Sequence, residues 1–287
     1  MNATISRIWS KRSVRRFRSN PIAIASISFL AALVVIAVLA NVLAPKDPNL
    51  QDLMTINSGP SGAHWLGTDL YGRDILSRLI VSTRVSLQAS AQAVSIGVLL
   101  GMPLGLIAGY RGGFLDTAMS RFADALLSIP GLLLAFAIVG SLGPGLTNAM
   151  LAVGIIMSPG FFRVARSASA DVRSELYIEA SRAAGCTRRR IIARHVLPNA
   201  AAPLLVQISI AAGVAIVAEA SLSFLGLGVK TPQASWGSMI NETFRDPARN
   251  SYPILPPALM IGLTVLAVSM LGDAIRDSIG RETRGGK

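Results

Sequence analysis

Long apolar runs separated by short polar segments dominate the pattern of residues along this chain. Several runs reach the ~20 residues that a helix needs to cross a bilayer. The predicted transmembrane helices lie at about 22–44, 87–109, 117–141, 147–165, 200–226 and 255–275. The first run follows several arginines, but it is too long for the apolar region of a secretory signal, so we interpret it as a permanent anchor. The pattern predicts an all-α polytopic membrane protein with six transmembrane helices.

Small residues and prolines mark special positions inside the predicted helices. Four glycines, each four residues apart, share one face of the second helix, where they allow a neighbouring helix to approach closely. These are Gly97, Gly101, Gly105 and Gly109. The third helix contains SIPG at 128–131 and the fourth contains SPG at 158–160. Both stretches predict bends or local unwinding, which backbone tolerates where protein surrounds it.

The charge is unevenly distributed between the polar segments. The net charge is +12, and most lysines and arginines lie in the N-terminal segment, the 110–116 turn, the 163–199 loop and the C-terminal segment. These segments share one side of the predicted helices. By the positive-inside rule, this side and both termini are cytoplasmic. The basic character therefore indicates topology and contact with lipid headgroups, and we expect no nucleic-acid partner.

This topology divides the chain into five parts. They are a cytoplasmic segment at 1–21, the first transmembrane helix at 22–44, an external loop with an amphipathic helix at 45–86, a core of five transmembrane helices at 87–279 with a cytoplasmic loop at 166–199, and a cytoplasmic tail at 280–287.

The external loop is predicted to end in an amphipathic helix. Gly67 and Gly72 have the pattern of turn residues. Residues 74–87 then show helical apolar spacing with Arg78 and Arg84 between the apolar positions. This pattern is typical of a helix that lies in the membrane interface and leads into the second span.

The sequence lacks the patterns of catalysis. It contains no GxxxxGK[ST] loop for nucleotide phosphates, no GxSxG and no HExxH. Cys186 is the single cysteine, which excludes an internal disulfide, and His64 and His195 lie far apart. We expect no enzyme activity, no metal site and no bound cofactor on this chain.

Three acids lie inside the predicted spans: Asp124, Glu219 and Asp273. A charged side chain at mid-bilayer costs roughly 2.5–3.5 kcal/mol, so it normally faces the bundle interior or a water-filled path. Glu219 is surrounded by small residues, a pattern that fits a pathway or gate and a purely structural role equally well. We take Glu219, Ser223 and Asp124 as candidates for a translocation pathway or gate.

A compact basic stretch, EASRAAGCTRRRIIARHVLPN, runs from Glu179 to Asn199. Its pattern predicts a short helix from about Ser174 that Gly185 ends as a C′ glycine. Thr187 then suits the N-cap of an arginine-rich helix, and Leu197-Pro198 ends this helix and starts the fifth span. The small residues at the turn leave room for docking. Binding to anionic lipid explains the arginines equally well.

Three stretches resemble a known family. EASRAAG followed by Leu197-Pro198 resembles the EAA motif of ABC-importer permeases, with Ser181 in place of the second alanine and His195 where isoleucine is frequent. HWLGTDLYGRDILSRLI and SFLGLGVKTPQASWGSMI resemble two blocks of the C-type permease subunit of dipeptide/oligopeptide/nickel importers. Together the stretches make the resemblance specific, and it extends over essentially the whole chain.

The resemblance implies a type I ABC-importer permease fold and a division of labour. This chain would pair with a homologous permease subunit in a bacterial plasma (inner) membrane, and an extracytoplasmic solute-binding protein would deliver di- or oligopeptides. Two ATPase subunits or domains would bind ATP and Mg and dock on the EAA loop. The matching coupling residues are Glu179, Ala180, Ser181, Arg182, Ala183, Gly185, Leu197 and Pro198.

Three alternatives to this reading of the residues stay open. The same machinery could import nickel or another small solute. An ion-driven secondary transporter could use the three acids, but it leaves the basic stretch unexplained. A membrane scaffold without transport leaves Glu219 unexplained.

Overall fold

A computed structural model describes residues 15, 17–245 and 251–280 of the chain. Five of its helices are long and apolar enough to cross a membrane, and a bent pair of shorter helices supplies a sixth span. The helices are α3 (Pro21–Val38), α4 (Ala40–Leu43), α5 (Ile75–Arg111), α6 (Gly113–Ser128), α7 (Gly131–Leu142), α8 (Leu146–Arg173), α9 (Leu176–Ala183), α10 (Arg188–Ile191), α11 (Leu197–Phe224), α12 (Trp236–Phe244) and α13 (Leu255–Gly280), with short turns η1 (Leu53–Thr55), η2 (Ile192–Val196) and η3 (Tyr252–Ile254). The prediction of an all-α protein with six spans is confirmed.

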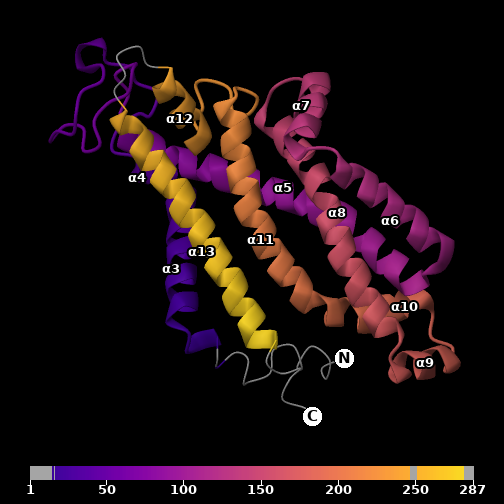
Figure 1. Cartoon of the computed structure of the whole chain (residues 1–287). Coiled ribbons are helices and arrows are strands. Elements are labelled where there is room, and N and C mark those ends of the chain that lie inside the picture. The colour runs from indigo at the N-terminus through magenta and orange to yellow at the C-terminus, as the bar shows by residue number, and fades with distance from the viewer. Residues whose placement is uncertain (1–14, 16, 246–250, 281–287) are drawn as a thin grey trace.

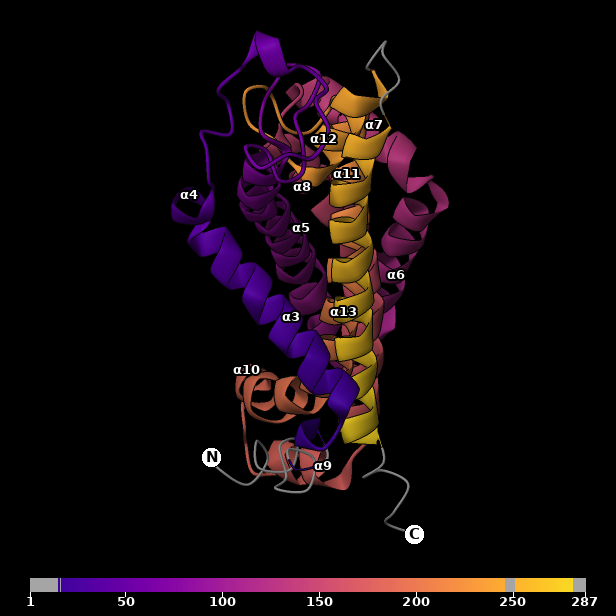
Figure 2. The ribbon, with the colours of Figure 1, turned by 90° about the vertical axis from the view of Figure 1, so that its left-hand side faces the viewer.

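The long helices run between two distinct ends of the molecule (Figures 1 and 2). One end, which we call the cap end, carries the segment 44–74 together with α7 and α12. The opposite end, the loop end, carries α9 and α10 beside the last turns of α5 and α8. The first turn of α3 and the last turn of α13 also lie at the loop end. The described chain therefore starts and finishes at the end that carries the basic stretch.

The helices α5 and α8 form the closest contact in the molecule, along the predicted glycine face. A Cβ atom added to Gly101 would lie 2.1 Å from the carbonyl oxygen of Ser158, and one on Gly109 would lie 2.2 Å from that of Arg166. Gly105 is equally close to the Phe162 carbonyl, at 2.4 Å. Only glycine permits this backbone approach, which supplies dispersion contact where lipid gives no hydrophobic drive. The predicted packing face is confirmed.

The two proline stretches differ. At SIPG, α6 ends at Ser128 and α7 begins at Gly131, and the two axes meet at 91°. At SPG, in contrast, α8 passes through Pro159 as one helix, so of the predicted alternatives, a bend or local unwinding, the unwinding is wrong there. Proline has no N–H for the carbonyl four residues earlier. That carbonyl belongs to Ile155, and it accepts a hydrogen bond from Ser158 Oγ instead, at 2.7 Å.

Several helices extend beyond their predicted bounds. The predicted amphipathic helix is not a separate element, because α5 continues without a break from Ile75 to Arg111. The helix α8 continues to Arg173, eight residues beyond the predicted end at 165. Ser169 and Val172 are buried in this extension, and Ser169 Oγ donates to the Leu106 carbonyl of α5 at 2.8 Å. Contact with α5 thus maintains helix where the sequence predicted loop.

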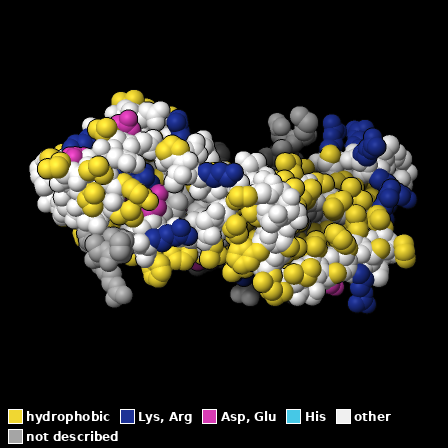
Figure 3. Space-filling view, turned by 90° about the horizontal axis from the view of Figure 1, so that it is seen from above, with side chains coloured by type: hydrophobic (Ala, Val, Ile, Leu, Met, Phe, Trp, Pro, Cys, Tyr) yellow, Lys and Arg dark blue, Asp and Glu magenta, His cyan; other side chains and the backbone are white. Residues whose placement is uncertain are grey.

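Much of the outer surface is apolar, as expected of a chain in lipid. Figure 3 shows a broad hydrophobic surface on the side where α6 lies in Figure 1. The exposed apolar side chains of α6 and α7 include Phe114, Phe122, Leu127, Leu132 and Leu133. Large exposed apolar patches mark contact with membrane or protein.

Candidate functional site

The basic stretch folds as a helical hairpin at the loop end. We call residues 174–196 the basic loop, which comprises α9, the turn, α10 and η2. Three apolar side chains of the loop, Ile178, Ile191 and Val196, are fully buried among residues of α5, α8 and α11. These side chains fix the position of the loop against the ends of the long helices.

The turn of the basic loop depends on Gly185. Its φ is +78°, in the left-handed region, and a Cβ there would meet nothing within 4 Å. Its N–H donates to the Arg182 carbonyl at 2.9 Å, as in a glycine C-cap. Thr187 occupies the N-cap position of α10, but its side chain makes no capping hydrogen bond. Backbone geometry, rather than side-chain capping, therefore defines the turn.

The predicted coupling residues lie together on this hairpin and at its junction with α11. Glu179, Ala180, Arg182, Ala183 and Gly185 are all exposed. Ser181 is half-buried, and its hydroxyl donates to the Tyr177 carbonyl at 2.7 Å, so the serine adds no bulk to the outer face.

Leu197 and Pro198 do not end the arginine-rich helix as the sequence predicted. The chain passes from α10 through the π-helical turn η2 directly into α11. Pro198 cannot donate to the carbonyl of Arg194, and Asn199 Nδ2 donates to the next carbonyl, of His195, at 2.6 Å. The loop is therefore continuous with the fifth span.

Glu219 is completely buried near the cap end of α11. One carboxylate oxygen accepts from Ser223 Oγ at 2.7 Å and the other from Ser86 Oγ of α5 at 3.2 Å. Ser86 Oγ also accepts from the N–H of Trp236, at 3.2 Å. The carboxyl group thereby joins α5, α11 and α12. Ser223 is buried as well, and it borders a cavity of about 540 Å³ that is shared with α12.

The other two acids of the predicted spans lie on the surface of this chain. Asp124 and Asp273 are both exposed. Asp124 pairs with Arg163 of α8 at 2.6 Å, and both side chains are about half exposed. The chain by itself therefore does not bring Asp124 together with Glu219 and Ser223.

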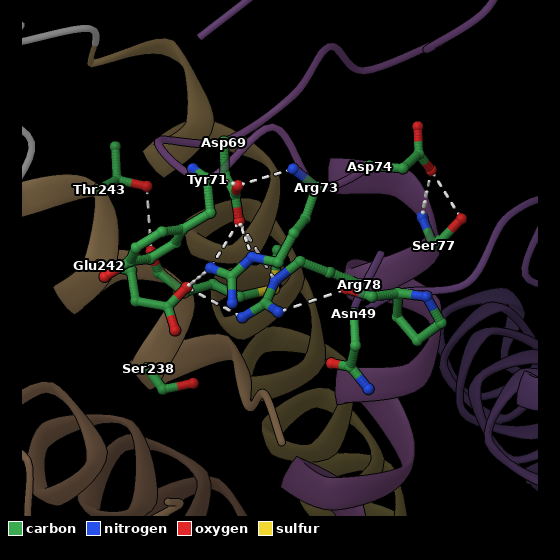
Figure 4. Close-up of polar contacts among 12 residues, drawn as sticks. Asn49, Asp69, Tyr71, Arg73, Asp74, Ser77, Arg78, Ser238, Glu242 and Thr243 are labelled. Carbon is green, nitrogen blue, oxygen red and sulfur yellow. Dashed lines mark hydrogen bonds and ion pairs between the residues drawn. The ribbon is translucent and has the colours of Figure 1, made fainter. Parts of the chain in front are cut away.

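A cluster of buried charges at the cap end was not predicted. Asp69, Arg73, Arg78 and Glu242 form it, and we call it the cap cluster (Figure 4). Arg73 binds Asp69 at 2.7 Å and Glu242 at 2.5 Å, and Arg78 binds Glu242 at 2.9 Å. The Arg78 side chain is only 1% exposed. The cluster joins the 45–74 segment and the start of α5 to α12, which lies 164 residues further along the chain.

Asp74 caps α5 next to this cluster. Its carboxylate accepts from Ser77 N–H at 2.8 Å, from Ser77 Oγ at 2.7 Å and from His64 Nδ1 at 2.9 Å. Burial alone would raise the pKa of Asp74, but these hydrogen bonds outweigh burial and place the pKa below its ordinary value of 3.8. His64 also contacts Lys46 Nζ through Nε2, at 3.1 Å. The histidine is thus part of a structural network.

No group of three metal-ligating side chains occurs in the described residues.

Sequence comparison places the chain in a family. The family described as "Binding-protein-dependent transport system inner membrane component" matches residues 101–285. This chain belongs to that family. The N-terminal part, residues 8–60, matches the "N-terminal TM domain of oligopeptide transport permease C". The predicted membership of the C-type ABC-importer permeases is confirmed.

Similar proteins extend over nearly the whole chain. The chain is 41% identical over 266 residues to a glutathione transport system permease protein GsiD of Pectobacterium atrosepticum, covering 92% of this chain and 88% of that protein. It is 40% identical over 272 residues to the protein of the same name from Escherichia coli, covering 94% and 90%.

The fold also matches solved structures. Two inward-facing structures of the MetNI methionine ABC transporter match with TM-scores of 0.60 and 0.58, at 19% and 21% identity. Each match covers 71% of this chain and 97% of the other. The chain therefore has an ABC-importer permease fold, and it is a membrane subunit of a transporter.

Proposed function

We propose that this chain forms half of the translocation pathway of a peptide importer. Its basic loop would transmit to the spans the conformational changes that ATP hydrolysis drives in partner ATPase subunits. The observation that carries the proposal is the construction of that loop. Three buried apolar anchors hold it against α5, α8 and α11, while the coupling residues of α9 and the turn lie on its outer face. A docking element needs both features, because it must present an outer face and transmit force to the spans.

The proposed partners follow from this assignment. A second, homologous permease completes the pathway, and two ATPase subunits or domains with bound ATP and Mg dock at the loop end. A solute-binding protein docks at the cap end. The excess of arginine at the loop end supports a cytoplasmic location for that end by the positive-inside rule, and with it a bacterial inner-membrane protein whose two termini are cytoplasmic.

The proposed cargo is a short peptide. The relatives are named as glutathione permeases, and the N-terminal match names oligopeptide transport. Glutathione is itself a tripeptide derivative, so glutathione and oligopeptides both belong to the class of small peptides. Uptake of radiolabelled glutathione, a dipeptide, an oligopeptide and Ni²⁺ into proteoliposomes holding the complete complex tests this class. Uptake of Ni²⁺ without any peptide would refute it.

The docking assignment is tested at Gly185 and Glu179. Valine at φ +78° is strained, whereas asparagine tolerates the left-handed region. We therefore expect Gly185→Val to abolish substrate-stimulated ATP hydrolysis in the reconstituted complex, and Gly185→Asn to retain most of it. Glu179→Ala removes a side chain from the exposed face of α9, so we expect it to lower the same activity without loss of complex assembly.

Complex yield by size-exclusion chromatography is the control for both positions. Full stimulation in Gly185→Val and in Glu179→Ala would show that the ATPases dock elsewhere.

A further inference from the structure

A basic cavity lies between the basic loop and the ends of the long helices. Its volume is about 600 Å³, and its lining residues are Tyr110, Arg111, Arg173, Arg182, Cys186, Arg188 and Ile191. The wall comes from the last turns of α5 and α8 on one side and from α9, the turn and α10 on the other. The cavity therefore opens where the loop meets the membrane-spanning core.

Four arginines line this cavity, and no acid is among its lining residues. Arg173 donates to the Arg111 carbonyl at 3.3 Å, and Arg182 donates to Tyr110 Oη at 3.1 Å. Both partners are neutral, so these hydrogen bonds hold two of the guanidinium groups without a direct ion pair. Asp116 lies within electrostatic range of Arg173, but it binds Arg166 with both carboxylate oxygens.

We propose that this cavity binds a phosphate-bearing anion, either the headgroup of an anionic phospholipid or a soluble polyphosphate. Guanidinium groups bind phosphate oxygens in pairs of parallel hydrogen bonds, and four of them can surround one polyanion. The cavity is also far larger than the ~30 Å³ that one water occupies in the liquid, which leaves room for a headgroup.

The position of the cavity fits either a lipid headgroup or a soluble polyphosphate. It lies at the ends of the spans α5 and α8, and Tyr110 and Ile191 give it an apolar border. Basic pockets between transmembrane helices at the positively charged face are typical sites for lipid headgroups. A bound anion would link Arg111 and Arg173 of the core to Arg182 and Arg188 of the loop. Binding itself does not depend on the docking of an ATPase to the outer face of α9.

Cys186 supplies a direct test because it lines the cavity and is the only cysteine in the chain. The full-length chain is placed in nanodiscs of phosphatidylcholine, and its reaction with the uncharged reagent N-ethylmaleimide is timed. Inorganic pyrophosphate or added phosphatidylglycerol should slow the reaction, by about fivefold at a concentration four times the dissociation constant. Slowing by pyrophosphate assigns a soluble anion, and slowing by phosphatidylglycerol assigns a lipid.

Neighbouring arginines supply the matched controls. Arg173→Gln and Arg188→Gln each remove a charge from the cavity wall and should reduce the protection. Arg189→Gln removes the same charge from the adjacent position of α10, outside the cavity, and should leave protection intact. No protection by either probe, or protection that survives in both wall variants, would overturn the proposal. Protection that arises only when the ATPase subunits are added would also overturn it, and would assign the arginines to a protein contact.

Discussion

Arginine serves opposite purposes at the two ends of this molecule. In the cap cluster, Arg73 and Arg78 are almost completely buried and each binds carboxylates. In the basic loop, Arg182, Arg188 and their neighbours are exposed, and none of the ion pairs among the described residues involves an arginine of this loop. Arginine is therefore paired with carboxylates in the cap cluster and exposed in the basic loop.

The difference predicts unequal contributions of the two regions to stability. At the cap end, segments distant in sequence are joined by charge pairs, and removal of one arginine leaves this buried cluster with an excess negative charge. At the loop end, apolar anchors provide the attachment, and the charges contribute little to folding. Substitutions at matched residue types in the two regions should therefore have unequal effects.

The largest expected effect is at Arg78. Replacement by methionine leaves Glu242 with one arginine fewer and should lower the free energy of unfolding by about 3–5 kcal/mol. The same replacement at exposed Arg189 should change it by less than ~0.5 kcal/mol. Chemical unfolding of the detergent-solubilised chain measures both. Equal changes in the free energy of unfolding at Arg78 and Arg189 would contradict the inference that arginines stabilise the cap end but not the loop end.

A second comparison uses two glycines with the same backbone conformation. Gly72 has φ +73° and Gly185 has φ +78°. An alanine Cβ at Gly72 would lie 1.9 Å from the Asp52 carbonyl oxygen, whereas at Gly185 it would meet nothing within 4 Å. Gly185→Ala should lower the free energy of unfolding by about 1–2 kcal/mol, which is the strain of a non-glycine residue in the left-handed region. Gly72→Ala should lower the free energy of unfolding by a further ~1–3 kcal/mol, because the new Cβ atom would clash with the Asp52 carbonyl.

The same unfolding experiment measures both alanine variants. If Gly72→Ala lowers the free energy of unfolding no more than Gly185→Ala does, the backbone of the cap segment can shift to accommodate the added Cβ atom.

The smallest expected effect concerns acid pH. Because the folded-state pKa of Asp74 is lowered, its carboxylate stabilises the fold fully above the ordinary value of 3.8, and this contribution is lost as the pH falls below that value. Hydrogen-exchange protection near the start of α5 should therefore weaken at low pH, while protection in the basic loop changes less. Asp74→Asn should show weaker protection already at neutral pH and a flatter acid response. An unchanged acid response in that variant would exclude Asp74 as the cause.

The features that the sequence predicted well depend on local spacing. The glycine face of α5, the break at SIPG and the turn at Gly185 all follow from residues within one or two helical turns, and the structure confirms each. Gly67 and Gly72 were also predicted as turn residues, and both have positive φ.

The remaining features depend on contacts between distant segments. Nothing near Arg78 indicates that its partner is Glu242, so the start of α5 was interpreted as an interfacial helix. The SPG stretch remained helical because a neighbouring serine satisfied the carbonyl that proline leaves free. Asp124 was a candidate for the pathway, but in this chain it lies on the surface and pairs with Arg163, a contact between α6 and α8 that its neighbours in sequence do not indicate. Whether Glu219 affects transport also remains a prediction, although its hydroxyl partners account for its burial.

The length of α5 has a mechanical consequence. Its 37 residues form one helix of about 55 Å, which begins beside the cap cluster and ends at the wall of the arginine cavity. The glycine contacts pack it tightly against α8, so we expect the two helices to move together. If this helix pair tilts about a point near the middle of α5, its two ends move in opposite directions. We therefore expect a tilt of this helix pair to couple the cap end to the loop end without a chain of intermediate side-chain rearrangements.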